Sequence, residues 1–64
     1  MVKKMKLWLL NPQTCKLEEK ECKVTLLKHS KNKKEVYYQF NHPFAKENVV
    51  GVLSTFLWQY LKAA

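Results

Sequence analysis

The chain has 64 residues, including 12 lysines and five glutamates but no arginine and no aspartate, which gives a formal net charge of +7. This length allows one domain at most, and the core of so small a domain provides only marginal stability. We therefore expect a single domain over residues 1–64 that is stabilised by self-association into a homodimer or by a protein partner.

Positive charge is concentrated in the first half of the chain. Residues 1–34 hold ten lysines and three glutamates, a balance of +7, whereas residues 35–64 hold two of each and are neutral. Such an asymmetry is typical of proteins that bind a polyanion. A lysine-rich surface that only keeps a small protein soluble would give the same pattern.

Residues near 3–10 alternate between apolar side chains and lysine or aromatic ones, which predicts a β-strand with one apolar face. Asn11 and Pro12 follow, and these residue types are favoured at the first two positions of a type I turn, so the chain should reverse there. Residues 15–21 are mostly charged, and we expect no more than a short strand at Lys16–Glu18.

Two further segments, near 22–28 and 35–41, show the same alternation and predict two more strands. The stretch between them, residues 29–34, is polar throughout and lacks the Asn-Gly signal of a tight two-residue turn. It therefore predicts a longer hairpin loop.

The C-terminal third predicts an amphipathic helix near residues 44–62. Its apolar side chains recur at helical spacing and form one broad stripe. Pro43 suits the start of a helix, and Glu47 would complement the helix dipole in the opening turns. The members of the stripe are Val49, Val50, Leu53, Phe56, Leu57, Tyr60, Leu61 and Ala64.

These elements predict an α+β fold in the order β-β-β-α. The simplest arrangement is an antiparallel meander of three strands, or four if Lys16–Glu18 also pairs, with the C-terminal helix packed across one face. The other face of the sheet would then be open to solvent.

The open face predicts a nucleic-acid-binding surface, because lysines alternate there with aromatic rings. Lysines neutralise phosphates and release counterions, and aromatic rings on a sheet stack on unpaired bases. The absence of arginine removes the usual bidentate contact to guanine, so the predicted DNA or RNA binding has little base specificity. The candidate residues are Lys4, Lys6, Trp8, Lys23 and Tyr37 on the sheet, and Lys31, Lys33 and Lys34 in the loop.

An alternative interpretation is a small interaction module, such as an inhibitor, an antitoxin or a phage-type modulator, that docks on a larger protein. A partner would then cover the open face, with lysines at the rim. Trp58 is a second candidate contact, because the predicted helix places it on the exposed side, beside Gly51 and Thr55, and tryptophan is a common anchor at interfaces. These three residues are the predicted interface of a homodimer or of a complex with a partner.

No catalytic, metal or cofactor site is predicted. The single glycine excludes a Gly-rich phosphate loop, and no residues supply an oxyanion hole for a cysteine nucleophile. The gaps between the two cysteines and the two histidines do not match the close ligand pairs of structural zinc sites. No signal peptide, membrane span or membrane-binding helix is predicted, so we expect a cytoplasmic protein with reduced thiols.

Overall fold

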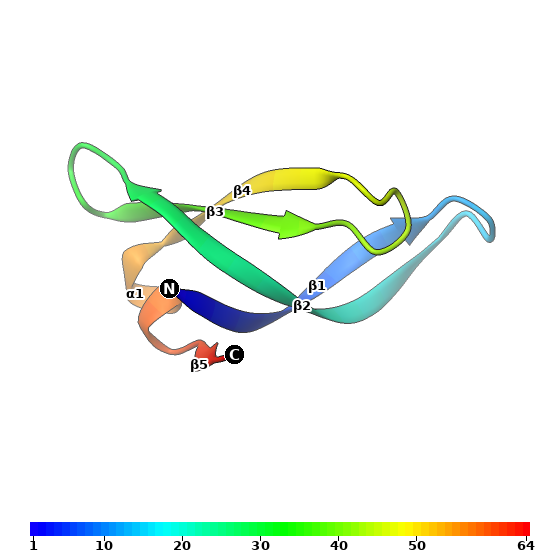
Figure 1. Ribbon diagram of the computed structural model, residues 1–64, viewed down its shortest axis with the longest axis horizontal. Coiled ribbons are helices and arrows are strands. Elements are labelled where there is room, and N and C mark those ends of the chain that lie inside the picture. The colour runs from blue at the N-terminus through cyan, green and yellow to red at the C-terminus, as the bar shows by residue number, and fades with distance from the viewer.

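The computed structural model describes residues 1–64 and contains a five-stranded antiparallel sheet with one short helix (Figure 1). The sheet order is β4-β3-β2-β1-β5, so the first four strands form a meander and β5 returns to pair with β1 at the opposite edge. The elements are β1 (Val2–Asn11), β2 (Lys16–His29), β3 (Glu35–Asn41), β4 (Asn48–Ser54), α1 (Thr55–Gln59) and β5 (Lys62–Ala63).

An antiparallel meander with a helix is thus confirmed in outline, but the sheet has five strands instead of three or four. The three predicted strands correspond to β1, β2 and β3, and β3 has the predicted bounds. Lys16–Glu18 is indeed extended, but it is the start of β2 and not a separate strand. The long β2 pairs with β1 from Lys16 to Thr25 and then with β3.

The predicted helix over residues 44–62 is wrong. Residues Asn48–Ser54 form β4, and only the five residues Thr55–Gln59 are helical. The segment is rich in valine, whose branched Cβ favours strands, and it pairs without interruption along β3. Helical and strand spacing overlap in so short an apolar run, and the pairing with β3 decides between them.

Pro43 lies in the β3–β4 turn and does not begin a helix. The backbone N–H of His42 donates to the carbonyl of Glu47 at 2.8 Å, and the N–H of Lys46 donates to the carbonyl of His42 at 2.8 Å. Lys46 adopts a left-handed conformation, with φ of 55°, which completes the reversal. This turn lies beside the β1–β2 turn, so the far ends of the two hairpins meet (Figure 1).

The core lies between the curved sheet and α1, on the side of the sheet that we call the core face. Six residues are buried there, and none of them is classed as polar or charged. Their neighbours are only partly buried, because α1 is too short to cover the whole core face. The buried residues are Cys22, Val24, Val36, Tyr38, Phe40 and Trp58.

Trp58 was expected on the exposed side of a helix, and this expectation is wrong. Only 4% of Trp58 is exposed, and α1 turns it onto the core face of the sheet. Lys3 fixes this position from β1, since its Nζ donates to the Trp58 carbonyl at 2.7 Å and lies 5.0 Å from the centroid of the indole ring. The helix is capped at its start by Ser54, whose hydroxyl accepts from the N–H of Leu57 at 3.1 Å.

Gly51 lies in the middle of β4, directly opposite Tyr38 of β3. A Cβ atom at this position would come within 2.4 Å of the Tyr38 ring, so the ring packs over the glycine backbone. Glycine is therefore required for the close approach of this buried tyrosine. No helix of the protein is long and apolar enough to cross a membrane.

Candidate nucleic-acid interface

The side of the sheet opposite α1, which we call the open face, carries all five sheet residues of the predicted site. Directly opposed residues of an antiparallel pair share a face, so the register of the strands defines its membership. Among these residues, Trp8 is 65% exposed and Tyr37 is half-buried. The five are Lys4, Lys6 and Trp8 of β1, Lys23 of β2 and Tyr37 of β3.

Three lysines lie directly opposite one another across three neighbouring strands of the open face. Lys4 in β1 pairs with Lys62 in β5 on one side and with Lys23 in β2 on the other. Adjacent strands are about 4.8 Å apart, and like charges in directly opposed positions destabilise a sheet. We call Lys62, Lys4 and Lys23 the lysine row.

No carboxylate forms an ion pair with the lysine row. The one ion pair within 4.0 Å joins Lys20 to Glu18 at 3.8 Å, and both residues belong to the core face of β2. The row is therefore a local concentration of positive charge, with Glu21 at the next open-face position of β2. Sequence reasoning missed Lys62 because it placed this residue on a helix, where its cross-strand position next to Lys4 could not be seen.

A second basic group lies at the other end of the open face, where Lys28 and Tyr37 are direct cross-strand neighbours. The Nζ of Lys28 lies 5.2 Å from the centroid of the Tyr37 ring. The pairing of β2 with β3 is irregular between Leu26 and Lys28, and this bulge moves Lys28 to the open face. Strict alternation from Val24 and Leu26 would have placed Lys28 on the core face, which explains why the sequence did not single it out.

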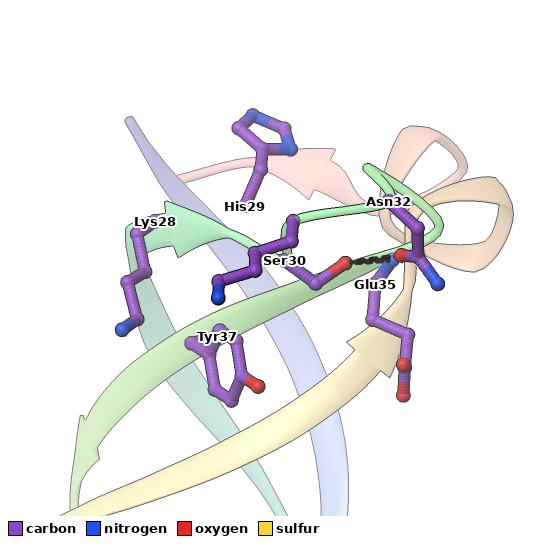
Figure 2. A pocket seen from close by; sticks show the side chains of 7 residues that line it. Lys28, His29, Ser30, Asn32, Glu35 and Tyr37 are labelled. Carbon is purple, nitrogen blue, oxygen red and sulfur yellow. Dashed lines mark hydrogen bonds between the residues drawn. The ribbon is translucent and has the colours of Figure 1, made fainter.

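The β2–β3 loop presents the three predicted loop lysines, all exposed, beside this second group. Side chains of the loop itself hold its shape: Ser30 Oγ donates to Asn32 Oδ1 at 2.7 Å, and the Lys34 N–H donates to the same oxygen at 2.9 Å. Lys33 completes the turn with φ of 60°. Figure 2 shows Lys28 and Tyr37 on one side of this hairpin, with His29 pointing away from them.

The structure separates the two aromatic residues of the predicted site. Trp8 pairs with Glu19 near the start of β2, whereas Tyr37 pairs with Lys28 near its end, about 30 Å further along the strand. Trp8 has apolar neighbours on its other side, because Leu10 and Leu17 oppose each other at the next open-face position. These two leucines are 54% and 62% exposed.

The predicted interface residues do not form one surface. Gly51 is in β4, while Thr55 begins α1 and its hydroxyl donates to the Lys33 carbonyl at 2.8 Å. Trp58 is buried in the core, as described above, and retains too little exposed area to anchor a partner.

Both cysteines are free thiols, Cys15 exposed and Cys22 buried. Burial raises the pKa of the Cys22 thiol, which disfavours the reactive thiolate. No three histidine, cysteine or acidic side chains are grouped closely enough to hold a metal ion.

Comparisons of the chain with protein-family models, with curated proteins and with solved structures find no match.

Proposed function

We propose that the protein is a small non-catalytic nucleic-acid-binding protein that contacts DNA or RNA phosphates with its open face. The lysine row is the observation that carries this proposal. Three ammonium groups in opposed positions repel one another, and a phosphate backbone across the row would relieve that repulsion. A lysine surface serving only solubility has no need to place like charges opposite one another.

Exposed basic and aromatic side chains continue from the lysine row along the open face in both directions, and they would extend its contact with a strand of nucleic acid. Lys6 and Trp8 follow Lys4 at alternate positions of β1, so a strand of nucleic acid along β1 would meet charge first and an indole ring next. In the other direction, Lys28 and Tyr37 lead to the loop lysines. Glu21 and Glu19 oppose Lys6 and Trp8, which places negative charge on one flank of this path.

The proposal predicts binding to oligonucleotides with a steep dependence on salt. In a fluorescence-anisotropy titration at low salt, labelled single- and double-stranded oligonucleotides should both bind. The logarithm of the binding constant should fall linearly with the logarithm of salt concentration, by about 0.7–0.9 for each phosphate contact. The absence of binding to both forms at low salt would contradict the proposal.

Trp8→Ala should weaken single-strand binding more than duplex binding, because only unpaired bases are available to stack on the indole. The expected loss is about 1–3 kcal/mol for the single strand. Leu17→Ala is the matched control, since it removes a similarly exposed apolar side chain of the same face without removing a ring. Equal losses for single strand and duplex would show that Trp8 does not stack on bases.

A second candidate function, docking on a larger protein, is favoured by the apolar end of the open face. Trp8, Leu10 and Leu17 are all more than half exposed and lie next to one another on β1 and β2. Contiguous apolar surface of this kind is typical of protein interfaces. A protein partner would remain bound after nuclease treatment of a lysate, whereas a complex bridged by nucleic acid would be lost.

A further inference from the structure

The outer edge of β4 carries none of the features that protect sheet edges from pairing. β4 is an end strand of the sheet, with β3 as its only neighbour, and its register with β3 is uninterrupted over all seven residues. Its sequence, NVVGVLS, contains no charged residue and no proline. Sheet edges normally avoid such strands or interrupt them with lysine, proline or a bulge, because their free backbone groups pair readily with another strand.

The opposite edge of the sheet is protected in part. β5 covers β1 at Lys3 and Lys4, and the remaining part of β1 carries Lys6 and ends before Pro12. A charged side chain on an exposed edge opposes the close approach of a second strand. The two edges therefore differ, and β4 offers the longer uncharged edge, seven residues against the five of Leu7–Asn11.

The free backbone groups of β4 belong to its open-face residues. The N–H of His42 donates to Glu47, and the N–H of Thr55 donates to Lys34 at 2.9 Å; these bonds flank the β3–β4 ladder. Hydrogen-bonded pairs alternate with non-bonded ones in an antiparallel ladder. The backbone groups of residues 49, 51 and 53 therefore point to β3, and those of Val50 and Val52 point outward.

The sequence of β4 is nearly symmetric about Gly51. In an antiparallel pair of two copies centred on Gly51, Val50 of one copy lies opposite Val52 of the other, and Asn48 lies opposite Ser54. The outward backbone groups of these residues then face one another, as a hydrogen-bonded ladder requires. Facing valines are also a favourable cross-strand pair, and glycine permits the close approach of the two backbones at the centre.

We propose that a second copy of this chain pairs with β4 through its own β4, in antiparallel register about Gly51, to form a homodimer with one continuous sheet. The two-fold axis is perpendicular to the sheet, so the open faces of both copies lie on the same side. Because β4 carries no charge, no like charges face one another across the proposed ladder. This inference does not depend on nucleic-acid binding, although the dimer would present two lysine rows on one surface.

The test uses charges placed in opposed positions of the proposed interface. Val50 and Val52 are 58% and 50% exposed, so their replacement leaves the core of each copy intact. In a dimer of the Val50→Lys/Val52→Lys variant, each introduced lysine would lie opposite an introduced lysine of the other copy. In a dimer of the Val50→Glu/Val52→Glu variant, each introduced glutamate would likewise lie opposite a glutamate. Each variant alone should be monomeric, and an equimolar mixture of the two should form a heterodimer.

Sedimentation equilibrium at high salt, after nuclease treatment, is the measurement. The wild-type chain should have twice its monomer mass of 7.6 kDa, each charge variant the monomer mass, and the mixture twice that mass again. Val52→Pro, which removes only an outward N–H, should also be monomeric, and circular dichroism should show that each variant is folded. A monomeric wild type, dimeric single-sign variants, a monomeric mixture or open-ended polymers would each overturn the proposal.

Discussion

Trp58→Ala is expected to destabilise the protein severely. Replacing a buried tryptophan by alanine typically costs about 3–5 kcal/mol, because the apolar transfer energy is lost and a cavity remains. Domains have about 0.05–0.15 kcal/mol of stability per residue, so a chain of this length has about 3–10 kcal/mol in total. The loss is therefore about a third or more of the whole stability of the fold.

The position of Trp58 makes this residue difficult to replace. It is the only buried residue outside β2 and β3, so it closes the core from the side opposite the sheet. Its loss would also leave the Lys3 ammonium without the indole ring above which it lies. No other buried side chain of α1 can move in to fill the space, since Trp58 is the only one.

Urea denaturation followed by circular dichroism measures this effect, and Trp8→Ala is the matched control. Trp8 is 65% exposed, so its removal should change the free energy of unfolding by no more than about 0.5 kcal/mol. The control variant retains Trp58 as its only tryptophan, and its fluorescence should shift to longer wavelength on unfolding. A Trp58→Ala variant that unfolds at the same urea concentration as the wild type would contradict the assignment of Trp58 to the core.

The contrast between the two tryptophans shows what the sequence predicts and what it does not. Alternation in β1 identified the exposed side of that strand, and with it Trp8, because a strand with one polar face has a period of two residues. Trp58 follows a run of valines in which helical and strand periods both fit, so its environment depended on whether that run pairs with the preceding strand β3. The local sequence pattern was therefore sufficient to predict the exposure of Trp8 but not the burial of Trp58.

The candidate site was predictable to a similar degree. Alternation placed Lys4, Lys6 and Lys23 on one face, and the structure agrees. Lys28 was missed because a bulge, which adds a residue without a clear sequence signal, reverses the side on which it lies. Lys62 was missed because its neighbour across the sheet is Lys4, a contact between the two ends of the chain that no local pattern encodes.

The lysine row leads to the second large effect. Because its like charges oppose one another directly, removing them should stabilise the fold, by roughly 0.2–1 kcal/mol for each opposed pair. The same change should remove the strongest phosphate contacts. Lys4→Gln/Lys23→Gln/Lys62→Gln is therefore expected to raise the free energy of unfolding and, at the same time, to weaken nucleic-acid binding.

Salt titration of the triple variant separates the loss of specific phosphate contacts from the loss of net charge. The slope of the logarithm of the binding constant against the logarithm of salt concentration should decrease by about 2–3, in proportion to the three contacts removed. Lys16→Gln/Lys20→Gln/Lys46→Gln is the control, since it removes the same charge from two core-face positions of β2 and from the β3–β4 turn. The control should keep most of its slope and gain no stability.

A gain in stability together with a loss of nucleic-acid binding in the row variant would show that the lysine row serves binding and not only solubility. If the three lysines served only solubility, both triple variants would lose the same small part of their long-range attraction for a polyanion, and their slopes would be equal. If instead the open face bound a protein through its apolar end, the row variant would become more stable without a specific loss of nucleic-acid binding. Opposed lysines destabilise the sheet, so a functional lysine row must compensate by strengthening the binding of nucleic acid. Equal salt slopes for the two triple variants would show no such contribution and would therefore reject the proposed function.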